Sequence, residues 1–244
     1  MISTHWQLPA APLRASAVAT VVAGFAGAIA IAELARGVLP VGGIYAVKAG
    51  AIFSIVMIVA LGFLPRHHPF ARFGPANQIT TMRAMLVALV AALIGEPRFP
   101  NVATSAAAAS VVVSALDGVD GWLARRHQIA SRFGARFDME IDALLILVLA
   151  ILVTEFEKAG PWVILSGLLR YIFVGAGKYW PRLRAPLFAS RRRQAVCVVQ
   201  ILALNLAIVP AIQPPLSAAM AAGALAALAW SFLIDTRWLL RSAA

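Results

Sequence analysis

Apolar stretches long enough to cross a lipid bilayer make up most of this 244-residue chain. Hydrophobic residues account for 61% of the sequence and charged residues for 13%, a composition unlike that of a soluble domain. About twenty apolar residues cross a bilayer as a helix. Eight such stretches lie at about 15–35, 42–64, 77–95, 102–124, 137–155, 161–178, 194–212 and 216–236. The sequence therefore predicts an all-α, polytopic membrane helix bundle.

The 21 lysine and arginine residues are distributed unevenly over the two sides of this predicted bundle. If the helices alternate from a cytosolic N-terminus, sixteen lie at cytosolic ends or loops. Only Arg36, Arg98 and Lys158 lie on the other side. This asymmetry is the one described by the positive-inside rule. The net charge of +11 thus indicates an orientation in a membrane, and no nucleic-acid partner is expected.

A polar break at 65–75 separates the first two apolar stretches from the six that follow. The sequence predicts an N-terminal transmembrane helix pair over 1–70 and a six-span membrane domain over 75–244. Asn77 is expected to cap the first helix of this second domain, because asparagine is a preferred N-cap residue.

Four aspartates lie on a regular spacing where the fourth stretch ends and the fifth begins. The segment is D-G-V-D-G-W-L-A-R-R-H-Q-I-A-S-R-F-G-A-R-F-D-M-E-I-D. Asp117 and Asp120 are three residues apart, and Asp138 and Asp142 are four apart, so each pair lies on one face of a helix. Polar residues between the pairs suit a turn at the membrane surface. Two antiparallel helices joined by this turn would bring the acidic faces together.

A cluster of carboxylates beside a membrane span is costly and indicates a functional site. Four carboxylates repel one another, and each resists ionisation unless its charge is compensated. Two divalent cations would balance the four charges, and an all-oxygen ligand set favours Mg²⁺, Mn²⁺ or Ca²⁺ over zinc. Such ions suit the polarisation of a phosphoryl group. The alternative is that nearby arginines neutralise the acids: Arg125, Arg126, Arg132 and Arg136.

Small residues share the acidic faces. Gly121 and Ala124 follow the first pair on its helix, and Gly134 precedes the second pair. They are expected to leave open volume beside the carboxylates, as a flat or bulky ligand requires.

The pattern D-x2-D-G-x2-A-R-x8-G-x3-D-x3-D resembles the signature of the CDP-alcohol phosphotransferase (phosphatidyltransferase) family. The chain matches every fixed position: Asp117, Asp120, Gly121, Ala124, Arg125, Gly134, Asp138 and Asp142. Upstream, P-A-N-Q-I-T-T-M-R resembles the opening of the family's first core helix, through Pro75, Asn77, Thr80 and Arg83. The resemblance covers about 75–244, and the first helix pair lies outside it.

This resemblance implies an enzyme of phospholipid biosynthesis that transfers a substituted phosphate from a CDP-linked donor to a hydroxyl and releases CMP. The expected donor is CDP-diacylglycerol, and the acceptor is a small polar alcohol. By resemblance, two Mg²⁺ or Mn²⁺ ions would be held by Asp117, Asp120, Asp138 and Asp142. Asp142 would also be the general base. The nucleotide pocket would be shaped by Gly121, Ala124, Arg125 and Gly134. A homodimer in a bacterial inner membrane is expected, with its active site facing the cytosol.

Several basic residues outside the motif are candidates for acceptor binding. Arg191, Arg192 and Arg193 would suit an acceptor phosphate, since arginine matches phosphate oxygens; alternatively, they anchor the chain on anionic lipid. Arg170 lies within the sixth stretch and either lines the acceptor cavity or pairs with a carboxylate. Lys48 either snorkels to the membrane surface or contacts a lipid headgroup.

Two other functions share some of these features. An intramembrane prenyltransferase also uses aspartates, a divalent metal and a diphosphate donor, but it needs two aspartate-rich motifs far apart in the chain. A cation or metabolite transporter can place carboxylates in a bilayer, but it does not need the glycine, alanine and arginine positions of the signature. CMP release with Mg²⁺ or Mn²⁺ separates the phosphotransferase from both.

The acceptor is not determined by the motif. At the third and fourth aspartates the chain reads D-M-E-I-D. This departs from the D-P-L-A-D typical of phosphatidylglycerophosphate synthases and from the D-S-L-A-D common in serine-type enzymes.

Overall fold

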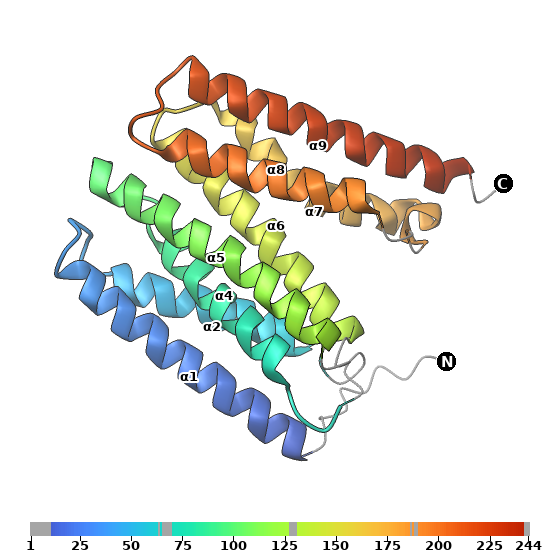
Figure 1. Ribbon diagram of the computed structural model, residues 1–244, viewed down its shortest axis with the longest axis horizontal. Coiled ribbons are helices and arrows are strands. Elements are labelled where there is room, and N and C mark those ends of the chain that lie inside the picture. Colours follow the sequence, from blue (N-terminus) through green and yellow to red (C-terminus); the bar gives the residue numbers. More distant parts are fainter. Residues whose placement is uncertain are drawn as a thin grey trace. The chain divides into compact units, whose positions relative to one another are not determined.

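The computed structural model describes residues 11–62, 64, 70–126, 131–185, 187 and 190–241, and only the backbone for 120–126 and 184. The α-helices are α1 (Ala11–Arg36), α2 (Tyr45–Gly62), α4 (Pro75–Ala92), α5 (Pro100–Arg126), α6 (Arg132–Glu155), α7 (Leu165–Tyr179), α8 (Arg191–Ile208) and α9 (Leu216–Arg241), shown in Figure 1. Two short 3₁₀ helices cover Pro161–Ile164 and Pro181–Arg184. These residues contain no strand, which confirms the all-α prediction.

Within the part of the chain that the structure describes, four helices are long and apolar enough to cross a membrane: Ala11–Arg36, Tyr45–Gly62, Pro100–Val119 and Leu216–Arg241. The protein is therefore a helical membrane protein. The eight spans expected from the sequence remain a prediction. Among the other helices, α4 carries polar side chains in its first half, including Asn77, Thr80 and Arg83, and α7 has only 15 residues.

The first helix of the predicted second domain begins differently from expectation. Its N-cap is Gly74, whose φ of 79° suits glycine. Pro75 takes the first helical position, where the missing N–H of proline costs nothing. Asn77 therefore lies inside the first turn of α4 and is not the N-cap. Its side-chain amide donates instead to the carbonyl of Phe73.

One compact unit comprises the chain up to Pro97 together with Ala108–Ile141. Within it, α1, α2 and α4 pack against one another (Figure 1). Small residues allow these helices to approach closely. A Cβ on Gly50 of α2, for example, would lie only 2.9 Å from Ile29 Cδ1 of α1. The N-terminal helix pair thus packs on the helix that opens the predicted second domain.

Polar contacts fasten this helix pair to α4 along its length. Near the start of α4, the backbone N–H of Phe73 donates to Ser16 Oγ at 3.0 Å. Further along, Tyr45 Oη donates to the carbonyl of Leu89 at 3.0 Å. Beyond its end, Lys48 Nζ donates to Ile94 O at 2.7 Å and pairs with Glu96 Oε1 at 2.8 Å. Lys48 thus joins α2 to the residues that follow α4, a contact that neither alternative from the sequence included.

The second compact unit comprises Arg98–Ala107 and Asp142–Ala244. In it α8 packs along α9, and α7 also contacts α9. A Cβ on Gly167 of α7 would lie 2.4 Å from Leu147 Cα of α6, so only glycine permits this approach. The loop after α6 is tied to the loop before α9, because Lys158 Nζ donates to Ile212 O at 2.8 Å. Burial lowers the pKa of the Lys158 ammonium.

Candidate active site

Two of the four aspartates are presented by the first half of α6. Ser131 stands just before this helix, and its Oγ accepts the backbone N–H of Gly134 at 2.9 Å. This is the bond of an N-cap serine, which satisfies an otherwise unpaired N–H group. The helix then places Asp138 and Asp142 one turn apart on the same face, as their spacing predicted.

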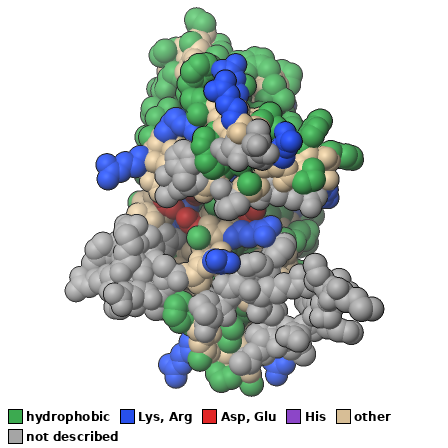
Figure 2. Space-filling model, turned by 90° about the vertical axis from the view of Figure 1, so that its right-hand side faces the viewer, with side chains coloured by type: hydrophobic (Ala, Val, Ile, Leu, Met, Phe, Trp, Pro, Cys, Tyr) green, Lys and Arg blue, Asp and Glu red, His purple; other side chains and the backbone are tan. Residues whose placement is uncertain are grey.

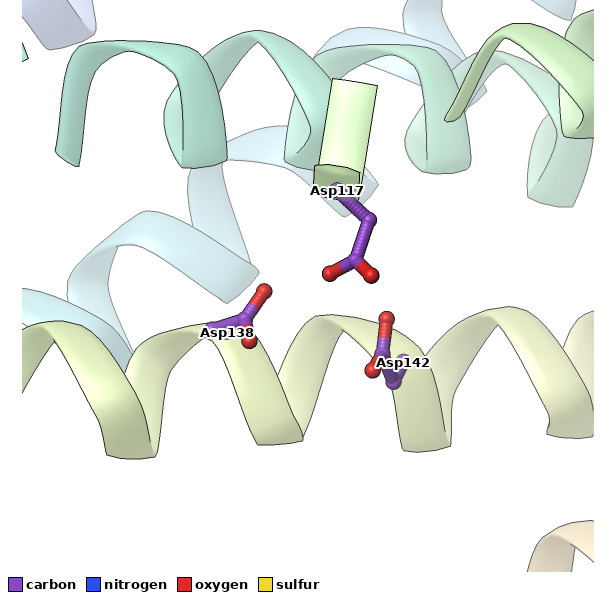
Figure 3. Close-up of side chains that lie close together, drawn as sticks. All are labelled: Asp117, Asp138 and Asp142. Carbon is purple, nitrogen blue, oxygen red and sulfur yellow. The ribbon is translucent and has the colours of Figure 1, made fainter. Parts of the chain in front are cut away.

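A third aspartate, Asp117 of α5, meets this face. One carboxylate oxygen from each of Asp117, Asp138 and Asp142 lies within 4.8 Å of the other two, and all three residues are half-buried. Figure 3 shows the carboxylate of Asp117 pointing toward α6, with those of Asp138 and Asp142 directed back at it. The predicted convergence of the two acidic faces is observed for these three residues, which we call the carboxylate cluster.

Arg83 of α4 contacts two members of the carboxylate cluster. Its Nη1 lies 2.9 Å from Asp117 Oδ1 and also pairs with Asp138 Oδ1. Its Nε donates to the backbone carbonyl of Val113 at 3.2 Å. Only 1% of the Arg83 side chain is exposed, compared with 39% for Asp117 and 36% for Asp138. A buried guanidinium therefore lies behind two half-exposed carboxylates.

Sequence reasoning assigned no role in the site to Arg83, which served only to support the family resemblance. One signal was available, because a cationic residue inside an apolar stretch is costly and usually has a partner. The neutralising arginines considered from the sequence are different ones. Arg132 and Arg136 are exposed on α6, and the side chains of Arg125 and Arg126 lie outside the described residues.

The remaining signature residues of α5 are described only by their backbone. Asp120, Gly121, Ala124 and Arg125 all lie within this helix. Their predicted roles therefore stay predictions. Because α5 is helical from Asp117 through Arg126, Asp120 stands one turn after Asp117, as the spacing required.

Gly134 lies where α6 approaches the start of α4. A Cβ on this glycine would lie 2.9 Å from Asn77 Oδ1 and 3.3 Å from Ser131 Oγ. Asn77 is 6% exposed. The volume left by the missing side chain is thus occupied by the Asn77 amide, whereas the sequence predicted open space there. Gly134 allows two helices to come together.

An aromatic chain holds the first turns of α6 against the segment before α4. The ring centroids of Phe73 and Phe133 are 5.9 Å apart, and those of Phe133 and Phe137 are 5.7 Å apart. All three side chains are buried. Since Phe137 directly precedes Asp138, this packing fixes the part of α6 that carries the carboxylates.

Cys197 of α8 lies beside the last member of the carboxylate cluster. Its Sγ is 4.0 Å from Asp142 Oδ2, the length of a weak thiol hydrogen bond. The sequence alone assigns Cys197 no role in the site.

The basic run at the start of α8 is only partly available to a ligand. Arg192 donates to Ser231 O at 2.7 Å and pairs with the carboxylate of Asp235, which is 4% exposed. Arg193 Nη1 lies 3.5 Å from the same carboxylate. Arg191 is exposed, and Arg170 is half-buried on α7. Arg192 is thus engaged in a contact between α8 and α9, which neither alternative from the sequence included.

The fold and the carboxylate cluster define an integral membrane protein with a candidate divalent-cation site. Its sequence matches the CDP-alcohol phosphatidyltransferase model over residues 73–234. Because this match covers well over half of the chain, the protein belongs to the CDP-alcohol phosphatidyltransferase family and is a transferase of phospholipid biosynthesis. Helices α1 and α2 lie outside the matched residues.

Two curated relatives are similar to part of the chain. A CDP-diacylglycerol–glycerol-3-phosphate 3-phosphatidyltransferase of Pseudomonas fluorescens is 29% identical over 140 residues, which cover 52% of this chain and 70% of the relative. A protein of the same name from Bacillus subtilis (strain 168) is 24% identical over 125 residues, 43% of this chain and 65% of the relative. No solved structure matches.

The family uses a divalent metal, and the carboxylate cluster fits such an ion. Its donors are oxygens, which hard cations prefer, and three of them converge within 4.8 Å. The carboxylates are exposed enough to be reached, whereas the Arg83 guanidinium closes the buried side.

Proposed function

We propose that this transferase moves the phosphatidyl group of CDP-diacylglycerol to a hydroxyl of a small phosphorylated alcohol and releases CMP. Glycerol 3-phosphate is the first candidate acceptor. The main support is that both similar relatives bear the name of that reaction. In addition, three carboxylates of this chain converge. Because residues 138–142 read D-M-E-I-D and not the D-P-L-A-D typical of phosphatidylglycerophosphate synthases, other acceptors must be tested as well.

The four aspartates of the signature would share the work of this reaction. Asp117, Asp120, Asp138 and Asp142 would hold two divalent cations, Mg²⁺ or Mn²⁺. When bound, such ions supply charge neutralisation at the diphosphate and its leaving group. Three of the four carboxylates converge in the structure, which supports a shared metal site.

Asp142 would also act as the general base. A hydroxyl is a poor nucleophile, and a carboxylate within hydrogen-bond reach can take its proton as the new bond forms. The acceptor oxygen then attacks the phosphorus that carries diacylglycerol. The bond from this phosphorus to the bridging oxygen breaks, and CMP leaves. The protein contributes mainly position and charge, which suffice for a transfer of this kind.

The other signature residues would form the nucleotide pocket. Gly121, Ala124 and Arg125 stand on the α5 face that carries Asp117, and Gly134 stands one turn before Asp138. At Gly134 the proposed role is indirect, because Asn77 fills the space beside it. Arg170, Arg191 and Arg193 are the candidates for the acceptor's phosphate, and Arg192 would support them through Asp235.

The protein would lie in a membrane with a defined domain order and orientation. A helix pair over 1–70 would precede a six-span catalytic domain over 75–244, in a bacterial inner membrane with the site facing the cytosol. The basic residues support this orientation. Figure 2 shows a surface on which several lysine and arginine side chains lie and to which acidic side chains are exposed. A homodimer is proposed from the family resemblance.

An acceptor panel with purified protein tests this function. CDP-diacylglycerol and Mg²⁺ are supplied with glycerol 3-phosphate, glycerol, serine or an inositol phosphate, and CMP and the lipid product are measured. Glycerol and glycerol 3-phosphate form a matched pair that differs only in the phosphate. We expect release of CMP with glycerol 3-phosphate at least tenfold faster than with glycerol or serine. Turnover with CDP-choline or CDP-ethanolamine alone, or a preference for serine, would overturn the assignment.

A further inference from the structure

The positively charged guanidinium of Arg83 contacts the same carboxylate oxygens that the proposed function assigns to the metal. Its Nη1 contacts Asp117 Oδ1 at 2.9 Å and Asp138 Oδ1 as well. A single nitrogen thus bridges two carboxylates from two helices, α5 and α6. The guanidinium and a divalent cation would therefore compete for these two oxygen atoms.

The guanidinium is held in place from behind. Nε donates to the carbonyl of Val113, and the side chain is only 1% exposed, so the guanidinium is buried. Val113 is itself fully buried on α5. The charge therefore remains beside the carboxylates whether or not an ion is bound, even if Nη1 yields its contacts to that ion.

A charge this close acts on a cation in two ways. It repels a divalent ion by Coulomb forces, which are strong where water is excluded. It also binds the ligand oxygens and must release them before they can coordinate. Arg83 further changes the charge balance: four aspartates carry four negative charges, and with Arg83 the sum is −3. Two divalent ions then leave +1, which favours an anionic diphosphate.

We propose that Arg83 is an internal competitor of the metal, a positioning residue that holds Asp117 and Asp138 together and lowers the affinity of the site for divalent cations. The inference rests on the proposed metal-binding role of the carboxylate cluster. It differs from a purely structural role in the sign of its effect. A scaffold residue raises metal affinity by ordering the ligands, whereas a competitor lowers it.

The test is Mn²⁺ binding to the purified full-length protein in detergent, without substrate, measured by electron paramagnetic resonance. Arg83→Gln removes the charge and keeps a hydrogen-bond donor, and Arg83→Lys keeps the charge. We expect Arg83→Gln to bind Mn²⁺ at least tenfold more tightly than the wild type. Arg83→Lys should bind within threefold of the wild type. In chelator, Arg83→Gln should unfold at a lower temperature, because the carboxylates then repel one another.

Three results separate the possible failures. No saturable Mn²⁺ binding by the wild type would overturn the metal site and the proposed function with it. Equal or weaker binding by a folded Arg83→Gln protein would overturn only the competitor role. Equally tight binding by Arg83→Lys and Arg83→Gln would show that charge is not the cause.

A second measurement keeps the test independent of how well the glutamine variant folds. In the wild-type protein labelled with ¹⁵N-arginine, the Nε–H signal that disappears in Arg83→Lys is assigned to Arg83. We expect this signal to shift on saturation with Mg²⁺. An unchanged signal at saturating Mg²⁺ would contradict the competition.

Discussion

Asp142 lies beside both carboxylates and a thiol. Its carboxylate belongs to the carboxylate cluster with Asp117 and Asp138, and it also lies 4.0 Å from the thiol of Cys197. Arg83 pairs with Asp117 Oδ1 and Asp138 Oδ1. In the proposed division of labour, Asp142 takes a proton as well as holding an ion.

Replacing Asp142 by asparagine should therefore abolish turnover without unfolding the protein. We expect CMP release by Asp142→Asn to fall at least 100-fold, because general-base catalysis alone typically contributes about 10²–10⁴. Thermal unfolding in detergent should stay near that of the wild type, since the amide keeps the shape of the carboxylate.

Glu140→Gln is the matched control for this variant. Glu140 lies on the same helix, two residues away, and is absent from the carboxylate cluster. It should retain activity within about twofold. Activity of Asp142→Asn within threefold of the wild type would remove Asp142 as the base.

At the scale of single residues, the sequence predicts contacts that a helix repeat enforces and misses those that the fold creates. The spacing of Asp138 and Asp142 alone places both on one face. Arg83, by contrast, is 55 residues from Asp138 in sequence, and no local period relates them. The same holds for Asn77, whose position beside Gly134 depends on two helices meeting.

At the scale of elements, the N-terminal helix pair and α4 behave as one assembly. The pair lies outside the residues that match the family, yet Ser16, Tyr45 and Lys48 all bond to α4 or its flanking residues. Since α4 carries Arg83, the helix pair supports the helix that closes the buried side of the site.

The ion pair at the far end of α4 should make this support dependent on pH. Burial alone raises the pKa of Glu96, but hydrogen bonds from Lys48 and from the Gly42 N–H outweigh it, and the net pKa is lowered from 4.5. A lowered folded-state pKa means that the stabilisation is complete above the unfolded value. It is lost as the pH falls through the folded value.

Lys48→Met should lower the free energy of unfolding at neutral pH by about 1–3 kcal/mol, because a half-buried charge loses its partner. The difference from the wild type should shrink as the pH falls through the lowered pKa of Glu96. Thermal unfolding in detergent at several pH values measures both effects.

Arg98→Gln provides the comparison for this prediction. Its pair with Glu157 is exposed at 57% and 83% and should contribute at most about 1 kcal/mol. Equal effects of the two substitutions at neutral pH would show that the Lys48–Glu96 pair has no special role.

The helices themselves were largely predictable, and their ends were not. Prolines mark several starts, as Pro75 and Pro100 do. The sixth apolar stretch, expected as one helix over 161–178, is divided into a 3₁₀ turn at Pro161–Ile164 and α7. Hydrophobicity gives the length of a segment, whereas such breaks depend on local backbone hydrogen bonds.

At the scale of the whole molecule, composition predicted the class of protein and the signature predicted the family, and both are confirmed. The acceptor could not be predicted in the same way. Its candidate ligands, Arg170, Arg191 and Arg193, come from separate helices or from a run without fixed spacing to the aspartates. Arg192 shows the difficulty, because its partner Asp235 lies on another helix.

The central claim is that the carboxylates of α5 and α6 form one metal-dependent site for phosphatidyl transfer. The direct test is the rate of CMP release from CDP-diacylglycerol and glycerol 3-phosphate as Mg²⁺ is titrated, for the wild type and Asp117→Asn. We predict a saturable dependence on Mg²⁺ in the wild type and a loss of at least 100-fold in Asp117→Asn, although Asp142 is intact. Full activity in chelator, or wild-type rates from Asp117→Asn, would contradict the account.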